Sequence, residues 1–177
     1  IGENGITYCA INSCLFSAVR MHGSHIVTVE GLAENDTLHP VQDAMVNNGA
    51  VQCGFCTPGI EMSLFCLFLK NPHPSREQLL SALEGNICRC TGYKAIADAA
   101  AEIESLWEKN FVPAYFEKIH VQMAKFSIKP RIVVGEQNIR NVKQFFAPEN
   151  EAELFEILSA PDCENSTILA GGTDIFV

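Results

Sequence analysis

The sequence contains two cysteine-rich stretches, QCGFCTPG at residues 52–59 and GNICRCTGY at residues 85–93. The first holds a C-x-x-C pair and the second holds a C-x-C pair. Each pair comes directly before a segment with helical patterning. Its sulfurs therefore lie near unpaired backbone N–H groups and the positive end of a helix dipole, which favour the thiolate. One further helical segment separates the pairs, so a compact bundle brings together the four sulfurs of Cys53, Cys56, Cys88 and Cys90.

Four thiolates without a histidine suit either zinc or an iron–sulfur cluster. Zinc sites favour a C-x₂₋₄-C spacing in both halves, and the C-x-C pair is tighter than that. The spacing leaves both metals open, with a structural or disulfide role as a third interpretation.

The composition is that of a folded, acidic protein. Of the 177 residues, 47% are hydrophobic and 19% are charged, which is enough apolar material for a core. A net charge of −9 argues against binding to a nucleic-acid backbone. No apolar run approaches the ~18 residues of a membrane-spanning helix, and no signal-peptide pattern is present. We therefore expect a soluble, cytoplasmic protein with no nucleic-acid partner and no membrane span.

Apolar spacing and capping signals predict a bundle of four short helices. Ser75 and Gln78 have the spacing of a capping box, and Thr91 is placed to cap the last helix. The expected helices cover residues 40–48, 57–70, 76–83 and 93–109.

The segments on either side of the bundle have other patterns. Alternating β-branched residues predict extended strands at residues 6–11 and 25–29. Prolines and glycines without a sustained period indicate a linker at residues 111–143. A short helix is expected at residues 151–158, followed by a strand that leads into the sequence LAGGTD at residues 169–174.

Both cysteine stretches closely resemble the helical [2Fe-2S] domain of the molybdenum hydroxylases, the family of xanthine dehydrogenase and aldehyde oxidase. The resemblance extends to TVEG at residues 28–31, LHPVQ at residues 38–42 and NSCL at residues 12–15. It implies an α+β fold made of four parts. These are the end of a β-grasp ferredoxin-like domain (1–34), a four-helix [2Fe-2S] bundle (35–110), a linker (111–143) and the start of an α+β FAD-binding domain of the PCMH type (144–177).

The resemblance also implies roles for individual residues. Cys53, Cys56, Cys88 and Cys90 would hold the cluster nearer the molybdenum, and Gln52 and Cys90 would approach the pterin of the molybdenum cofactor. Cys14 would be the last ligand of a second [2Fe-2S] cluster. The other three ligands of that cluster follow a C-x₄-C-x₂-C pattern that this sequence lacks, so we expect a chain truncated at both ends.

The C-terminal sequence resembles the loop that wraps the pyrophosphate of FAD in this family, because glycines allow backbone N–H groups to approach phosphate closely. The expected cofactor-binding residues are Leu169, Ala170, Gly171, Gly172, Thr173 and Asp174.

The predicted function is that of the electron-transfer portion of a xanthine dehydrogenase-like enzyme. Electrons would pass from a molybdenum–pterin centre on a partner chain or segment through two [2Fe-2S] clusters to FAD and an acceptor such as NAD. The resemblance implies an oligomer, with hydroxylation of the substrate outside this segment and no catalytic residue within it. An aldehyde oxidase or another molybdenum hydroxylase iron–sulfur subunit is an alternative. A zinc-stabilised, non-redox binding module is the alternative from another class.

The remaining cysteines and the histidines show no ligand spacing. Cys9 and Cys66 are expected to be buried core residues, and Cys163 is assigned no role. The histidines are interpreted as surface or turn residues: His22, His25, His39, His73 and His120.

Overall fold

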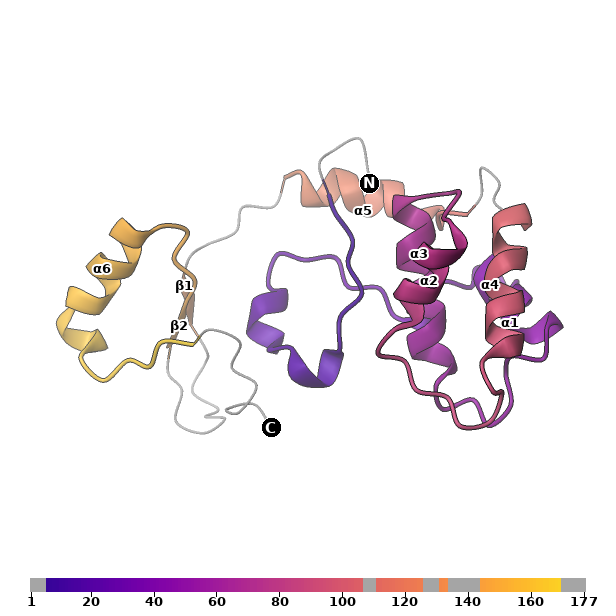
Figure 1. Ribbon diagram of the computed structural model, residues 1–177. Coiled ribbons are helices and arrows are strands. Elements are labelled where there is room, and N and C mark those ends of the chain that lie inside the picture. The colour runs from indigo at the N-terminus through magenta and orange to yellow at the C-terminus, as the bar shows by residue number, and fades with distance from the viewer. Residues whose placement is uncertain (1–5, 107–110, 126–130, 134–143, 170–177) are drawn as a thin grey trace. The chain divides into compact units, whose positions relative to one another are not determined.

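The computed structural model describes residues 6–106, 111–125, 131–133 and 144–169 (Figure 1). The chain divides into two compact units. The first unit comprises Ile1–Ala10 with Ile26–Ala124, and the second comprises Ile11–His25 with Lys125–Val177. The first unit contains both cysteine pairs and is described in most detail because it carries the candidate site.

Four helices form the centre of the first unit and confirm the predicted bundle: α1 (Pro40–Asn47), α2 (Thr57–Lys70), α3 (Arg76–Leu83) and α4 (Lys94–Leu106). Helix α1 packs against α4 and α2, while α3 packs against α2 and α4 (Figure 1). The bounds of α2 and α3 are those expected from the sequence. Helix α4 begins one residue later than expected, because Tyr93 has a positive φ of 67° and is therefore not helical.

Two helices of the bundle begin with reciprocal side-chain caps. At α3, the Ser75 hydroxyl accepts a hydrogen bond from the backbone N–H of Gln78 at 3.3 Å. The side-chain oxygen of Gln78 accepts one from the backbone N–H of Ser75 at 2.8 Å, which confirms the predicted capping box. At α1, His39 Nδ1 accepts the N–H of Val41 at 3.2 Å, and the Gln42 side chain accepts the N–H of His39 at 3.0 Å. An imidazole therefore takes the acceptor role that is usual for Ser or Asp.

His39 is a buried residue, and its interpretation as a surface or turn residue was wrong. Its exposed fraction is 5%, and its Nε2 donates to the carbonyl oxygen of Phe111 at 2.5 Å. Since Nδ1 is already an acceptor, the two hydrogen bonds select the neutral tautomer with its proton on Nε2. Burial lowers the pKa of His39 and maintains this neutral form, against the opposing effect of the Phe111 carbonyl.

An aromatic cluster fills the core beside His39. Phe65 of α2 is 2% exposed, and its ring lies 5.7 Å from that of Phe111 and 6.1 Å from that of Phe116. Tyr8 stacks on Phe116 at 5.3 Å. Aromatic pairs at these separations add a little stability to the large apolar area that they bury. Through these ring contacts, segments that are distant in the sequence pack against helix α2.

The expected linker at residues 111–143 contains regular structure. Its first part includes α5 (Tyr115–Met123), and its second part includes the strand β1 (Arg131–Val133). Prolines and a glycine interrupt the apolar residues of this segment, so no periodic pattern indicated a helix. Phe111 and Phe116 are nevertheless both buried in the core of the first unit. Burial of these aromatic rings against α2 gives α5 a fixed place, which local periodicity alone did not reveal.

The two strands expected near the N-terminus are absent from the described residues 6–31. Those residues form 3₁₀ turns and irregular backbone, with turns at η1 (Ser13–Leu15), η2 (Ala18–Met21) and η3 (Val29–Gly31). A strand needs a neighbouring strand to complete its hydrogen bonds, whereas Tyr8 is anchored by its side chain, whose hydroxyl lies 2.8 Å from His120 Nε2. His120 is therefore a partner of Tyr8 as well as a residue of α5.

The second unit contains a small antiparallel sheet and a helix. Strand β1 pairs with β2 (Gln144–Phe146), and α6 (Glu151–Ser159) follows, one residue longer than predicted. Asn150 caps α6 by accepting the N–H of Glu153 at 3.0 Å. A turn, η4 (Pro161–Cys163), ends this part. Ile168 and Leu169 lie in no strand, contrary to expectation, and residues 170–177 of the expected FAD loop lie outside the described residues.

None of the described helices has the length and apolar character to cross a membrane.

Phe65→Ala should destabilise the first unit by about 3–5 kcal/mol, because it removes the ring that contacts both Phe111 and Phe116 and leaves a cavity. Chemical unfolding followed by helical circular dichroism measures this loss. Phe155→Ala is the matched control, since Phe155 of α6 is 64% exposed. Equal effects of the two substitutions would contradict the assigned core.

Candidate metal centre

The C-x-x-C pair forms a turn that leads directly into α2. Cys56 is the N-cap residue of α2, and Thr57 and Pro58 form its first turn. Proline suits this position because its missing N–H would have no intrahelical partner. Gly54, between the cysteines, has a φ of 81°, a left-handed conformation that a side chain disfavours. This turn places Cys53 and Cys56 at the N-terminal end of the helix.

A close contact joins the C-x-C loop to the same end of α2. A Cβ atom at Gly59 would lie 2.9 Å from the side-chain oxygen of Asn86, so only glycine leaves room for that side chain. The Asn86 amide also donates to the Ser63 hydroxyl at 3.0 Å, one turn further along α2. Asn86 therefore docks the loop that carries Cys88 and Cys90 onto the helix that begins at Cys56.

Residues that follow the C-x-C pair shape its loop. The N–H of Cys88 donates to the Tyr93 hydroxyl at 2.9 Å, and the N–H of Tyr93 donates to the Thr91 hydroxyl at 3.2 Å. The Thr91 hydroxyl also lies 3.2 Å from Cys88 Sγ. Thr91 thus binds the residue just before α4, close to its predicted capping role, and in addition contacts a predicted ligand.

The four sulfurs interact as two pairs, Cys53 with Cys90 and Cys56 with Cys88. Hydrogen bonds from the Thr91 hydroxyl and from nearby backbone N–H groups lower the pKa of Cys88 to about 7. Burial, followed by the hydrogen bond with Cys88, raises the pKa of Cys56 to about 11. The pKa shifts of Cys56 and Cys88 are therefore opposite in direction.

The other pair behaves in the same way. The backbone N–H of Phe55 and then the Cys90 side chain lower the pKa of Cys53, whereas the hydrogen bond with Cys53 raises the pKa of Cys90. In each pair, the lowered pKa of one cysteine favours its thiolate form. The thiolate is the form of cysteine that ligates metals.

The four cysteines are chemically suited to either a zinc ion or a [2Fe-2S] cluster. Among the described residues, no group of three or more His, Cys, Asp and Glu side chains has the geometry of a metal site. Tetrahedral zinc takes four donors around one ion. A [2Fe-2S] cluster takes four cysteine thiolates shared between two irons. Cys53, Cys56, Cys88 and Cys90 supply the number and type of donor that either centre requires.

The remaining predicted residues belong to both units. Gln52 is exposed beside Cys53 in the first unit, whereas Cys14 is exposed in η1 of the second unit. Leu169 is half-buried, and Ala170 to Asp174 lie outside the described residues. The roles assigned to these residues stay predictions.

Two other cysteines were expected in the core. Cys66 is buried, as expected, and its thiol donates to the carbonyl oxygen of Tyr8 at 3.6 Å. Cys9 is exposed, so its expected burial was wrong. Its neighbour Tyr8 packs against α5 instead, and successive residues of extended backbone point in opposite directions.

Gly59, Asn86 and Tyr93 position the site and were not identified from the sequence. All three lie inside the two cysteine-rich stretches, and this position was the one feature of the sequence that could have indicated their role. Their contacts join residues far apart in the chain, which spacing does not reveal.

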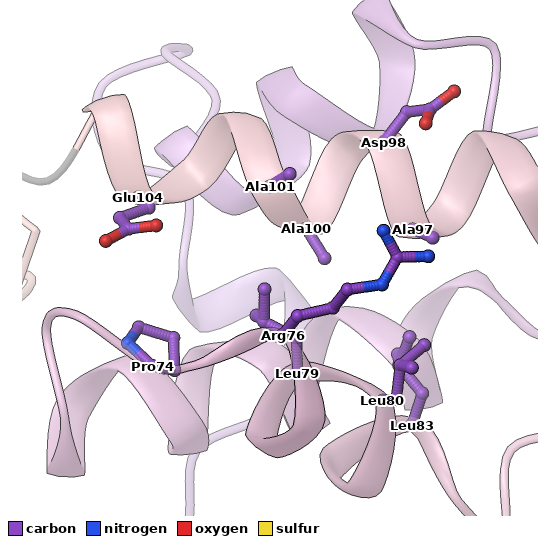
Figure 2. A pocket seen from close by; sticks show the side chains of 10 residues that line it. All are labelled: Pro74, Arg76, Leu79, Leu80, Leu83, Ala97, Asp98, Ala100, Ala101 and Glu104. Atoms are coloured by element: carbon purple, nitrogen blue, oxygen red, sulfur yellow. The ribbon is translucent and has the colours of Figure 1, made fainter.

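A separate groove of about 260 Å³ lies between α3 and α4 (Figure 2). Leucines and alanines line much of it, and the Arg76 side chain extends along it towards α4. The lining residues are Pro74, Arg76, Leu79, Leu80, Leu83, Ala97, Asp98, Ala100, Ala101 and Glu104. None of them is a predicted site residue.

Comparison with known proteins shows which proteins resemble the part of the chain that contains this site. The family described as "[2Fe-2S] binding domain" matches residues 28–101, which contain all four cysteines. The chain is 50% identical over 100 residues to a xanthine dehydrogenase of Blastobotrys adeninivorans, covering 55% of this chain and 7% of that protein. It is 48% identical over 99 residues to aldehyde oxidase 1 of Cavia porcellus, covering 55% and 7%. Over about half of its length, the chain is therefore similar to xanthine dehydrogenases and aldehyde oxidases.

Solved structures give matches over a similar part of this chain. A quinoline 2-oxidoreductase of Pseudomonas putida 86 is 40% identical with a TM-score of 0.42, covering 44% of this chain and 49% of that one. The aldehyde oxidoreductase of Desulfovibrio desulfuricans is 46% identical with a TM-score of 0.43, covering 45% and 9%. The chain spans less than a tenth of the length of the curated relatives named above.

Gly59→Ala should destabilise the first unit by about 1–2 kcal/mol, because the new methyl group displaces Asn86 and breaks its hydrogen bond to Ser63. In an Asn86→Ala background the same substitution should instead stabilise α2 by up to about 1 kcal/mol, the helix-propensity difference between the two residues. Thermal unfolding of the four proteins measures both effects. Identical effects in the two backgrounds would show that Gly59 and Asn86 are not coupled.

Proposed function

We propose that this chain is the electron-transfer portion of a xanthine dehydrogenase-like molybdenum hydroxylase and that Cys53, Cys56, Cys88 and Cys90 hold one [2Fe-2S] cluster. The observation that carries the proposal is the docking of the C-x-C loop onto the first turns of α2, where Asn86 lies against Gly59 and bonds to Ser63. The match to the [2Fe-2S] binding domain family over residues 28–101 supports it.

The residues around the cysteines prepare the site for metal. Thr91 and the backbone N–H groups near Cys88 stabilise its thiolate, and the N–H of Phe55 does the same for Cys53. All four sulfurs must be deprotonated to become ligands, and the raised pKa values of Cys56 and Cys90 make these two the harder to ionise. When bound, the cluster supplies a one-electron carrier. No residue of this chain is assigned a catalytic step.

The finer parts of the proposal come from the resemblance to the family. Electrons would reach this cluster from a molybdenum–pterin centre on a partner chain or segment, with Gln52 and Cys90 close to the pterin. They would continue through a second cluster, ligated in part by Cys14, to FAD bound at residues 169–174 and then to an acceptor such as NAD. We place this oligomeric enzyme in the cytoplasm. An aldehyde oxidase would use this chain in the same way.

Purified after growth with sufficient iron, the chain should be brown and contain about two irons and two sulfides from the quartet's cluster. Cys53→Ser or Cys88→Ser should remove the visible absorption and the iron and should also lower helical content, because metal binding and folding are linked. Cys9→Ser is the matched control, since Cys9 is exposed and outside the quartet. A colourless protein with one zinc would support the non-redox module, and full iron content in Cys88→Ser would refute the ligand assignment.

Gln52→Ala in the complete enzyme should leave the clusters assembled but lower turnover or molybdenum-cofactor retention about three- to tenfold, because one hydrogen bond to the pterin is lost. Gln122→Ala, at an exposed position of α5, is the control. Iron and molybdenum analysis with steady-state kinetics distinguishes the outcomes. Wild-type turnover and molybdenum content would show that Gln52 has no role at the pterin.

A further inference from the structure

Glu61 is a buried acidic residue on the helix that begins at the cluster site. It lies in the second turn of α2 and is 4% exposed. Among the described residues it is the one buried carboxyl group. Buried carboxylates are rare unless they are paired with a cation or serve a purpose. Glu61 has no part in holding the four sulfurs, so its burial needs a separate explanation.

The polar partner of Glu61 is the side chain of Gln42 on α1. The Gln42 amide also donates to the carbonyl oxygen of Val29 at 3.2 Å, and its oxygen accepts the N–H of His39. The Gln42 side chain therefore interacts with Val29 and His39 as well as with Glu61. A neutral amide of this kind stabilises a buried carboxylate less than a cation does.

The charged groups around Glu61 do not compensate for its burial. In the described part of the chain, no Lys, Arg or His side chain forms an ion pair with it. The elements packed against α2 include α1, α3, η3 and, through the rings of Phe65 and Phe116, α5. Their carboxylate, Lys and Arg side chains are exposed: Glu30, Asp43, Arg76, Glu77, Glu117 and Lys118. The cap residue His39 is buried and bonds to the Phe111 carbonyl, while the half-buried Tyr115 and His120 bond to Gly31 and Tyr8.

Burial without a cation favours the protonated carboxyl group and raises the pKa of Glu61 to about 7, with the Gln42 hydrogen bond acting in the opposite direction. Protonated and ionised forms are therefore both populated near neutral pH. A modest change in the local electrostatic potential shifts the balance between them.

The site proposed above lies close enough to produce such a change. Glu61 follows Cys56 by five residues, which corresponds to about 7.5 Å along the helix axis. Charges at such separations interact through protein with little screening by salt when one of them is buried. An added electron at the cysteine quartet therefore makes the ionised form of Glu61 less favourable.

We propose that Glu61 takes up a proton from water when an electron arrives at the cysteine quartet, so that electron transfer through this domain is coupled to proton transfer. This inference rests on the proposed function. In this step, a one-electron donor would reduce one ferric ion of a cluster held by the four cysteines, and a proton from solvent would form an O–H bond with a carboxylate oxygen of Glu61. Reoxidation reverses both events.

The coupling has a defined direction. Reduction raises the proton affinity of Glu61, so the reduction potential is highest at acid pH and falls as pH rises through neutrality. At a separation of this order we expect about a tenfold change in proton affinity. That change corresponds to a total fall of about 59 mV between the acid and alkaline limits, since tenfold is 59 mV for one electron.

The carboxyl group of Glu61 also affects folding stability. The pH dependence of its contribution is opposite to that of an acid in a salt bridge. Its pKa in the folded protein lies above the ordinary value of 4.5, so its contribution is present in full below that value. The contribution is lost as pH rises through about 7, where the folded protein must ionise a buried group.

The test is a redox titration of the iron-loaded protein between pH 5.5 and 8.5, with dithionite as the reductant and visible absorption as the signal. The wild-type potential should fall across the neutral range. Glu61→Gln should give an intact chromophore and a potential that no longer depends on pH in this range. Glu77→Gln, an exposed position on α3, is the matched control and should behave as the wild type does.

Infrared difference spectra of the wild type provide a second readout that needs no variant. Reduction at pH 7 should increase the C=O stretching band of protonated carboxyl groups. A pH-independent wild-type potential without this band change would overturn the inference while leaving the proposed function intact, as would an unchanged pH dependence in Glu61→Gln. A protein that forms no iron–sulfur chromophore would overturn the proposed function and the inference together.

Discussion

The docking of Asn86 against Gly59 is the constraint on which the candidate site depends. The two cysteine pairs lie on opposite sides of α3 in the sequence, and neither pair alone supplies enough sulfur ligands. Asn86 reaches the space above Gly59 and bonds to Ser63, which joins the second loop to the first turns of α2. The sulfur pairs then form across the junction, with one member from each loop.

The aromatic core performs the corresponding task for the rest of the first unit. Phe65 is part of the helix that begins at Cys56, so anything that positions Phe65 also positions the C-x-x-C turn. Phe111 and Phe116 supply rings from beyond α4, and His39 ties the start of α1 to the Phe111 carbonyl. The cap, the core and the site therefore share one rigid element. Helices as short as α1 and α3 depend on such packing for their stability.

The ionisation of acid groups in the first unit depends on whether cations lie beside them. Among the described residues, no Lys or Arg side chain is buried. The pKa values of Cys56 and Cys90 are raised, and burial raises the pKa of Glu61 to about 7. For the proposed electron-transfer role, this arrangement makes the protonation of Glu61 sensitive to charge at the site.

The sequence by itself determined the helices of the bundle, the α3 capping box and the four candidate ligands. These features depend on neighbours within a few residues, and caps, prolines and C-x-x-C spacing report such local interactions directly. Sequence patterns failed where a segment depends on distant partners. Residues 25–29 alternate like a strand but have no strand partner in the described structure, and the segment after Phe111 has little periodicity but is held by buried rings. Only the tertiary structure revealed that His39 is a buried cap, that Asn86 joins the two cysteine loops and that Glu61 lies in the interior. Each of these depends on contacts between residues far apart in the chain, and a one-dimensional pattern carries no information about which distant surfaces meet.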